Sequence, residues 1–346
     1  MKKLRLVSTA IITVFFFALS GATTVMAEDI LRIVFSQPGH FHDELNIGSR
    51  TAEKWKELVE TRSDGKIELQ LYGTGELYKS YPEMKKGLMV GTLDMADLYL
   101  TTLSREAPFY NAVALPGIFG PDVHEAAKAF YNFMKSEGAN IMQEQLEAKG
   151  AHLIAAYLEP YPGSRFRFKE KWTLEQLKGK KIRVPGAKKD LVFTKELGMV
   201  PTPISWGETY MALRQGVVDG CSATDRGYVM SKVYEVAPYT LDRYIAMGPT
   251  GYVANMKFWN KLTKEQKALI TQATLDAIAW AQENYGQRIL EAYKKELTEK
   301  AGGFYTFSKE DNLKWDQAAR VTKDFFVKEL DMQHVMDAMR QYIPKQ

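Results

Sequence analysis

The chain contains very little cysteine: Cys221 is the only one in 346 residues, so no disulfide can form within the chain. After residue 27 the sequence also lacks any apolar run near the roughly 20 residues that a membrane-spanning helix needs. The formal net charge of +4 falls to +1 when the basic residues of the first few positions (Lys2, Lys3 and Arg5) are set aside. Proteins that bind nucleic acid carry a strongly basic face or domain. The sequence therefore predicts neither a nucleic-acid partner nor a membrane span.

Recognisable catalytic motifs are also missing. The sequence has no Gly-x-Ser-x-Gly elbow, no His-Glu-x-x-His, no glycine-rich phosphate loop, and no cysteine paired with a plausible base. His40 and His42 form a His-x-His, which alone is poor evidence for a metal site. We therefore expect no enzyme, no cofactor and no metal, with a secreted hydrolase or lyase as the weaker alternative.

Residues 1–27 have the pattern of a cleavable signal peptide. A basic start precedes an apolar stretch of roughly 13 residues, and Val25-Met26-Ala27 supplies small residues at −3 and −1 of a cleavage site. No cysteine stands directly after the apolar stretch, so a lipoprotein anchor is not expected. We predict cleavage after Ala27 and export of the remaining chain.

The remaining chain alternates between strand and helix patterns, which indicates an α/β fold. At about 319 residues it is too long for one ordinary core, so two lobes are expected. The alternation begins near residue 30 and starts again at residue 151, with no Ser/Gly-rich linker between the halves. The lobes are therefore expected to be joined by more than one passage of the chain.

A proline-free helical pattern follows from Thr263 to about Ala301, and Thr263 with Gln266 has the spacing of a capping box. Unbroken, such a helix would be roughly 57 Å long, more than the diameter of one lobe. We expect it to span both lobes, with a bend near Gly286. Two helices broken at that glycine are the alternative.

A short echo relates the two halves of the chain. Gly91-Thr92-Leu93-Asp94 and Gly216-Val217-Val218-Asp219 each follow a helical pattern. In each case we expect the glycine to end the helix, the next two residues to form a short strand, and the aspartate to have a structural role.

The stretch "KKIRVPGAK" places one arginine in a strand pattern. Lys181 and Arg183 are expected on one face, with Ile182 and Val184 on the other. The residues alone leave three environments open for Arg183: water, a structural carboxylate, or a bound ligand.

The surrounding sequence, "LEQLKGKKIRVPGAKKDLVFTKELGMVPTPISWGETYMALRQGVVDG", resembles the signature region of the extracytoplasmic solute-binding proteins of TRAP transporters (tripartite ATP-independent periplasmic). The stretches "GTGELYKSYPEMKKGLMVGTLDMA" and "LPGIFG" and the long C-terminal helix are similar too, so the resemblance covers nearly all of the chain beyond the leader.

The resemblance implies a periplasmic, two-lobed receptor that closes over a small organic anion and delivers it to the small and large TRAP permease subunits. It implies a lobe I of residues 28–155 and 247–285 and a lobe II of residues 156–246 and 286–346. In that family the arginine of the Lys-Ile-Arg strand pairs with the ligand's carboxylate, which corresponds to Arg183.

Two departures from the family pattern concern the ligand. Gly163 stands where many members have a second arginine, and Arg165 is our choice for that role. Ala223 stands where an asparagine often contacts the ligand, so Thr224, Asp225 or Arg226 is expected to substitute. A C4-dicarboxylate, a hydroxy acid and a small sulfonate such as isethionate all stay open. So does a sensory role beside a membrane kinase.

Further candidates for ligand contact are Glu76, Trp206 and His40. Glu76 lies where the family often has Gln or Glu near the ligand, with a solvated turn as the alternative. Trp206 either stacks on the ligand or caps its helix. His40 follows the first strand and is expected near the cleft mouth.

Overall fold

The computed structural model describes residues 30–37, 46–73, 75–120, 123–161, 164–168, 173–241, 243, 246–286, 291–292, 295, 298–300 and 302–343. The first of its two sheets has the order β2-β1-β3-β10-β4. Its strands are Leu31–Ser36 (β1), Ile67–Tyr72 (β2), Met95–Tyr99 (β3), Ala151–Tyr161 (β4) and Ala246–Asn255 (β10). The second sheet has the order β11-β9-β5-β8-β6-β7. Its strands are Ser164–Phe166 (β5), Lys181–Val184 (β6), Val200–Pro203 (β7), Gly220–Ser222 (β8), Tyr239–Leu241 (β9) and Gly303–Tyr305 (β11).

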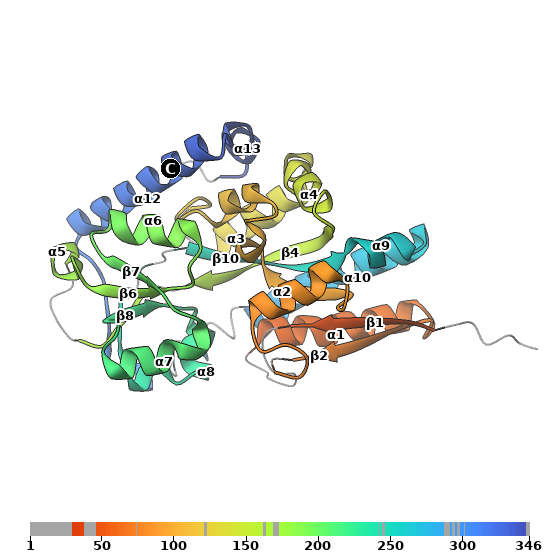
Figure 1. Ribbon diagram of the computed structural model, residues 1–346, viewed down its shortest axis with the longest axis horizontal. Coiled ribbons are helices and arrows are strands. Elements are labelled where there is room, and N and C mark those ends of the chain that lie inside the picture. The colour runs from red at the N-terminus through yellow and green to blue at the C-terminus, as the bar shows by residue number, and fades with distance from the viewer. Residues whose placement is uncertain are drawn as a thin grey trace, which may run out of the picture.

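Each sheet is covered by helices and forms one lobe (Figure 1). Lobe I holds α1 (Ile47–Arg62), α2 (Tyr81–Val90), α3 (Val123–Met134), α4 (Asn140–Glu147), α9 (Met256–Lys261) and α10 (Lys264–Ala281). Lobe II holds α5 (Leu174–Leu177), α6 (Lys188–Glu196), α7 (Trp206–Gln215), α8 (Asp225–Met230) and most of α12 (Lys309–Glu329). The expected two-lobed α/β fold is confirmed.

In lobe II, α6 lies between α12 and the sheet, while α7 and α8 lie on the opposite face (Figure 1). The two faces have separate cores. Ile182, Val184 and Phe193 pack with Trp315 of α12 on one side. Cys221 and Tyr228 lie in the cluster on the α7 and α8 side.

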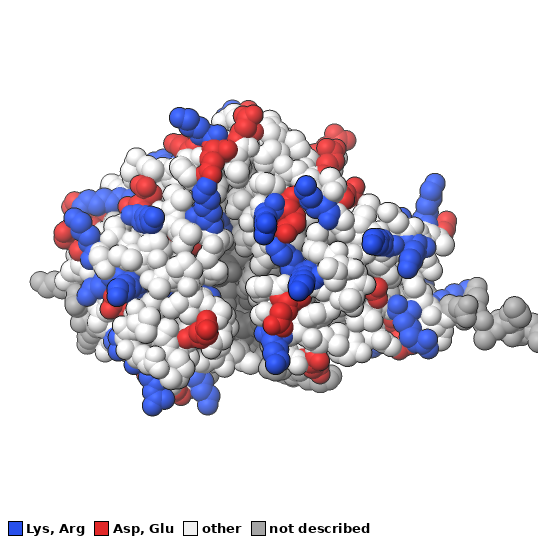
Figure 2. Space-filling view, viewed as in Figure 1, with Lys and Arg blue, Asp and Glu red and all other residues white. Residues whose placement is uncertain are grey.

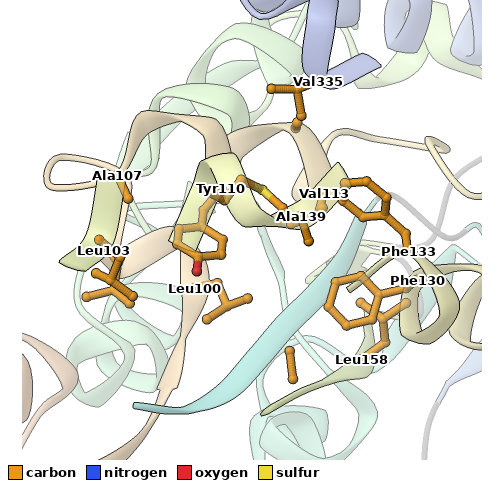
Figure 3. Packing of buried hydrophobic residues seen from close by; sticks show 14 of the residues in the cluster. Leu100, Leu103, Ala107, Tyr110, Val113, Phe130, Phe133, Ala139, Leu158 and Val335 are labelled. Atoms are coloured by element: carbon orange, nitrogen blue, oxygen red, sulfur yellow. The ribbon is translucent and has the colours of Figure 1, made fainter. Parts of the chain in front are cut away.

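The end of the chain returns to lobe I. Helix α13 (Gln333–Met339) packs against the core of that lobe, and Val335 lies above Tyr110 and Val113 (Figure 3). Phe326, near the end of α12, belongs to the same cluster. The C-terminal segment therefore contacts both lobes, and the lobe boundaries expected from the sequence stay predictions.

The long helix connects the two cores. Ile270, Ala277 and Ile278 of α10 pack in the lobe I core beside α1. After Ala281 the helix continues as a π-helical turn, Gln282–Gly286, and Tyr285 packs against the α7 and α8 cluster of lobe II. The capping box of Thr263 and Gln266 is present. Residues 287–290 lie outside the described part of the chain, so the expected bend near Gly286 stays a prediction. A π-helical turn is one of the usual places where a helix bends.

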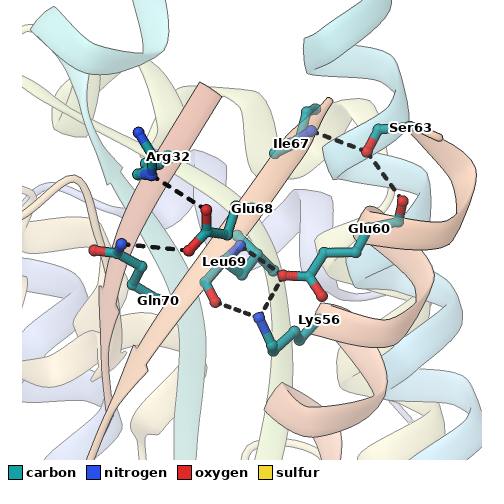
Figure 4. Close-up of polar contacts among 8 residues, drawn as sticks. All are labelled: Arg32, Lys56, Glu60, Ser63, Ile67, Glu68, Leu69 and Gln70. Carbon is teal, nitrogen blue, oxygen red and sulfur yellow. Dashed lines mark hydrogen bonds and ion pairs between the residues drawn. The ribbon is translucent and has the colours of Figure 1, made fainter. Parts of the chain in front are cut away.

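Polar contacts fix α1 to β2 on lobe I (Figure 4). Glu60 accepts the backbone N–H of Leu69, and Lys56 binds both the Glu60 carboxylate and the Leu69 carbonyl. The Ser63 hydroxyl accepts the N–H of Ile67. These contacts hold the C-terminal part of α1 against the sheet.

Candidate functional site

Strand β6 separates its side chains as its alternation predicts. Ile182 and Val184 belong to the core between the sheet and α6, whereas Arg183 lies on the α7 and α8 side. Arg183 is paired with Cys221 across the parallel strands β6 and β8, and only 6% of the residue is exposed. Its charge is therefore held largely away from bulk water.

Backbone carbonyls and one aromatic ring orient the Arg183 guanidinium. Nε donates to the Ile204 carbonyl oxygen at 2.9 Å, and Nη1 donates to that of Ser222 at 3.3 Å. The guanidinium carbon lies 5.2 Å from the ring centre of Trp206. Trp206 is fixed in turn, because its indole Nε1 donates to the Ser231 hydroxyl at 3.0 Å.

A second arginine lies in the same row. Arg165 of β5 is the antiparallel partner of Cys221, so Arg165, Cys221 and Arg183 follow one another across the sheet. Directly paired residues in a sheet point to the same face. Arg165 is fully buried, and its guanidinium carbon lies 4.5 Å from the ring centre of Tyr228. We call Arg165, Cys221 and Arg183 the arginine row.

The arginine row is suited to holding an anion. Burial raises the pKa of the Cys221 thiol to about 11, although Arg183 and Arg165 act to lower it. The thiol is therefore neutral near pH 7, and the row contains two cations and no anion. A guanidinium presents a planar fork of donors that matches a carboxylate.

The row lies where the two lobes face each other. Strands β1, β3 and β4 run in the same direction, and β4 leads into β5 of the other sheet. The carboxyl edge of the first sheet therefore faces lobe II. Likewise, β9 runs parallel to β8 and leads into β10, so the carboxyl edge of the second sheet faces lobe I. α/β folds bind ligands at carboxyl edges. Figure 2 shows the surface hollowed along this boundary, with both basic and acidic side chains on its rim.

Contacts from lobe I reach the α7 and α8 cluster. Ile47, the first residue of α1, packs against it. Arg50, one turn later, donates to the Tyr285 hydroxyl at 3.4 Å, and its guanidinium carbon lies 5.3 Å from that ring's centre. The N-terminal turn of α1 is thus the part of lobe I beside the arginine row.

Of the other expected contact residues, one lies at the arginine row and two make hydrogen bonds within their own segments. Trp206 lies at the row, stacked on Arg183. Glu76 is exposed and accepts the N–H of Gly73 within its own turn. The Thr224 hydroxyl accepts the N–H of Gly227 at 3.0 Å and caps α8. The side chain of Asp225, and His40 as a whole, lie outside the described part of the chain.

Sequence reasoning missed Tyr228 and the central place of Cys221. Cys221 follows Asp219-Gly220 in a short strand, so its pairing with Arg183 needed only the strand register. Tyr228 carried no such signal, because its contact with Arg165 depends on how α8 packs.

Among the described residues, no helix is both long enough and apolar enough to cross a membrane. Within the same residues, no three His, Cys, Asp or Glu side chains gather as metal ligands would.

The two lobes, the carboxyl edges that face each other and the buried arginines define a solute-binding protein of the two-lobed type. A model of one family matches residues 39–329, and the chain belongs to that family, bacterial extracellular solute-binding protein family 7. This is the TRAP-type family that the signature region resembles.

Two named relatives each match about four-fifths of this chain. The sialic acid-binding periplasmic protein SiaP of Vibrio cholerae is 26% identical over 278 residues, which are 79% of this chain and 80% of that protein. The C4-dicarboxylate-binding periplasmic protein DctP of Rhodobacter capsulatus is 24% identical, with the same shares covered.

Solved TRAP solute-binding proteins share the fold. One from Desulfovibrio desulfuricans with bound sn-glycerol-3-phosphate superposes with a TM-score of 0.81 at 20% identity, covering 91% of this chain and 98% of that one. One from Sulfitobacter with bound β-D-galacturonate gives a TM-score of 0.78 at 22% identity, covering 90% and 99%.

Proposed function

We propose that this protein is a periplasmic receptor that binds a small organic acid anion between its lobes and delivers it to the small and large subunits of a TRAP permease. The observation that carries the proposal is the arginine row, in which two buried arginines flank Cys221 at the carboxyl edge of the lobe II sheet. The relatives support it, since their names include sialic acid, C4-dicarboxylate and galacturonate ligands.

Binding is proposed to proceed by closure of the lobes. The ligand's acid group pairs with Arg183 and Arg165, and its remaining part contacts lobe I, so the closed form gains contacts that the open form lacks. The chain crosses between the sheets after β4 and after β9, and the π-helical turn Gln282–Gly286 interrupts the long helix between the two cores. The described π-helical turn is where a hinge would bend.

The acid group itself stays open between carboxylate and sulfonate. Both present several oxygen acceptors to a guanidinium. Other members of the family often have an asparagine at the position of Ala223. Here the position holds an apolar side chain, which packs in the α7 and α8 cluster.

Thermal unfolding of residues 28–346 against a panel of small acids tests the proposal. The panel holds C4-dicarboxylates, 2-oxo and hydroxy acids, sugar acids, aromatic acids and C2–C3 sulfonates. A ligand at a thousandfold its Kd stabilises the fold by about 4 kcal/mol, which raises Tm by several degrees. Arg183→Ala should abolish the response. Arg167→Ala, an exposed arginine beyond the same strand as Arg165, is the matched control and should keep it. A response to no acid, or one that survives in Arg183→Ala, contradicts the proposal.

A further inference from the structure

The strand pairing that defines the arginine row continues across the sheet to Thr240 of β9. Thr240 is the antiparallel partner of Arg165, and Phe304 of β11 is the parallel partner of Thr240. Directly paired residues point to the same face of a sheet, and Phe304 packs against the α7 and α8 cluster. Thr240 therefore points to the face that carries the two arginines, and only 1% of the residue is exposed.

The Thr240 hydroxyl has no hydrogen-bond partner among the residues that the structure describes. Five other buried threonines each donate to a backbone carbonyl oxygen. Thr250, which also lies in a strand, donates to that of Gly248 at 3.1 Å. Four in helices donate to the residue four positions earlier, and these are Thr51, Thr209, Thr274 and Thr322. The unpaired hydroxyl of Thr240 is thus an exception within this protein.

The retention of a hydroxyl at this position needs a reason. Valine has the same shape as threonine and a similar preference for strands. It would also avoid the cost of burying a hydroxyl without a partner. Unpaired buried polar groups are few in native proteins, and each calls for an explanation. A partner that arrives with the ligand is such an explanation, provided that the hydroxyl lies at the ligand site.

The surroundings of Arg165 place Thr240 at that site. Neighbouring strands lie about 4.8 Å apart, so the backbones of Thr240 and Arg165 are adjacent. The Arg165 guanidinium lies over the Tyr228 ring, and the Tyr228 hydroxyl donates to the Ala237 carbonyl oxygen, three residues before Thr240. The ring that holds the guanidinium is thus fixed to the segment that leads into β9. An acid group paired with Arg165 therefore lies beside the Thr240 hydroxyl.

The hydroxyl is suited to recognising an oxygen next to the acid group. In a 2-hydroxy or 2-oxo acid, the carbon that bears the acid group also bears an oxygen. That oxygen accepts a hydrogen bond from Thr240 while the acid oxygens pair with the guanidiniums. An acid without it leaves the buried hydroxyl unpaired. Sites built to bind a ligand hydroxyl discriminate strongly against analogues that lack it, for this reason.

We propose that Thr240 is a ligand-binding residue, and that its hydroxyl selects acids with an oxygen on the carbon that bears the acid group, against the same acids without that oxygen. This rests on the proposed function, because the arginine row must hold the acid group. The arginines do not supply this selectivity themselves, since a guanidinium pairs with either kind of acid.

Matched ligand pairs test the selection. Each pair compares an acid that has the oxygen with its counterpart that lacks it: L-lactate with propanoate, L-malate with succinate, 2-oxoglutarate with glutarate, D-gluconate with 2-deoxy-D-gluconate, and hydroxymethanesulfonate with methanesulfonate. Any other acid that the thermal panel identifies is compared with its own counterpart. Calorimetry on residues 28–346 should give, for the pair that binds, an affinity at least tenfold higher for the acid with the oxygen.

The outcomes separate this inference from the proposed function. Equal or tighter binding of the counterpart overturns the selection but leaves the proposed function standing. Binding of no acid at all counts against both.

Two variants of Thr240 separate ligand recognition from a structural role. Thr240→Val keeps the shape and removes the hydroxyl, so the affinity ratio within the pair should fall at least fivefold, while Tm of the ligand-free protein stays the same or rises. Thr240→Ser retains a hydroxyl and should keep most of the ratio. An unchanged ratio in Thr240→Val would mean that the hydroxyl does not meet the ligand, and the proposal would be wrong.

Thr322→Val is the matched control for Thr240→Val. Thr322 is also buried, but it lies in α12, which α6 separates from the sheet (Figure 1), and its hydroxyl donates to the Ala318 carbonyl oxygen at 2.8 Å. This variant should lose stability without changing the affinity ratio. A similar fall of the ratio in Thr322→Val would show that lost stability alone produces the effect, and would overturn the proposal.

Discussion

Asp94 and Asp219 make the same contact in the two lobes. Asp94 Oδ2 accepts the Val34 N–H at 2.9 Å, and Asp219 Oδ2 accepts the Lys181 N–H at 2.8 Å. Each aspartate follows a helix that ends in a left-handed glycine and precedes a strand parallel to the one it contacts. The echo in the sequence therefore marks a structural unit that occurs in both lobes.

The shared unit shows where the lobes differ. Ser36 of β1 and Arg183 of β6 occupy equivalent positions in this unit. Each lies two residues after the N–H that the aspartate accepts. Each pairs with the residue two positions after that aspartate, which is Ala96 for Ser36 and Cys221 for Arg183. One lobe thus carries a cation at the end of this strand, and the other carries a neutral hydroxyl.

The two glycines of this unit should be about equally sensitive to substitution. Gly91 has φ = +86° and Gly216 has φ = +75°, and each caps its helix. Replacing either by alanine forces a side chain into the left-handed region, which costs roughly 1–2 kcal/mol. Urea unfolding should show that loss for both. Gly207→Ala has open space around its Cβ and should be near neutral. If Gly216→Ala left the free energy of unfolding unchanged, the left-handed helix cap assigned to Gly216 would be contradicted.

Trp206 should influence ligand affinity through Arg183. A ring stacked on a guanidinium contributes about 0.5–2 kcal/mol, so Trp206→Ala should weaken acid binding roughly two- to thirtyfold. Trp206→Phe, which retains a ring, should recover most of the affinity. Calorimetry with the acid identified by the panel measures both.

The control for Trp206 is Trp259→Ala, which removes a similar contact in the lobe I core, with the Lys267 ammonium 5.8 Å from the ring centre. Its affinity should match that of the parent. Equal losses in Trp206→Phe and Trp206→Ala would mean that stacking is not the cause.

Asp94 should make stability depend on pH. Burial raises the pKa of its carboxyl, against the opposing effects of the Val34 N–H and Lys261. A carboxyl whose pKa is raised in the folded state binds a proton more tightly there than in the unfolded chain, so its contribution to stability falls as pH rises through the folded pKa. Asp94→Asn keeps an acceptor for Val34 and removes the titration. The difference in Tm, variant minus parent, should therefore be larger at pH 7 than at pH 4. A difference that does not change with pH would contradict this.

Much of lobe II followed from the sequence, because its signals are local. Alternation placed Arg183 opposite Ile182 and Val184, and the altered position of the second arginine pointed to Arg165, which lies in the same row. The partners of these arginines did not follow, because they depend on tertiary packing. Tyr228 and Ser231 reach the site only because α8 packs against the sheet.

One local expectation was wrong for a specific reason. Thr92-Leu93 and Val217-Val218 were expected to be strands, but the strands begin after the aspartates. The N–H groups of Thr92 and Val217 instead bind helix carbonyls, at Gly87 and Ala212, in the turns that close the helices. Helix-closing hydrogen bonds prevailed over strand propensity there.

Cys221 offers a direct probe of the arginine row. It is fully buried and its pKa is raised to about 11, so at pH 8 only about one thiol in a thousand is ionised. In urea, with an ordinary pKa near 8.5, about a quarter is ionised. Labelling by iodoacetamide at pH 8 should therefore be at least roughly a hundredfold slower in the folded protein, since the thiolate is the reactive form.

The same reaction measures access to the site. If the thiol reacts when the lobes open, a saturating acid that bridges the lobes should slow labelling of Cys221 further, and the slowing should disappear in Arg183→Ala. Arg183 also lowers the Cys221 pKa, so its removal should reduce the rate in the absence of acid. A rate in Arg183→Ala that exceeds the parent's would mean that opening of the fold, rather than ionisation of the thiol, limits the reaction.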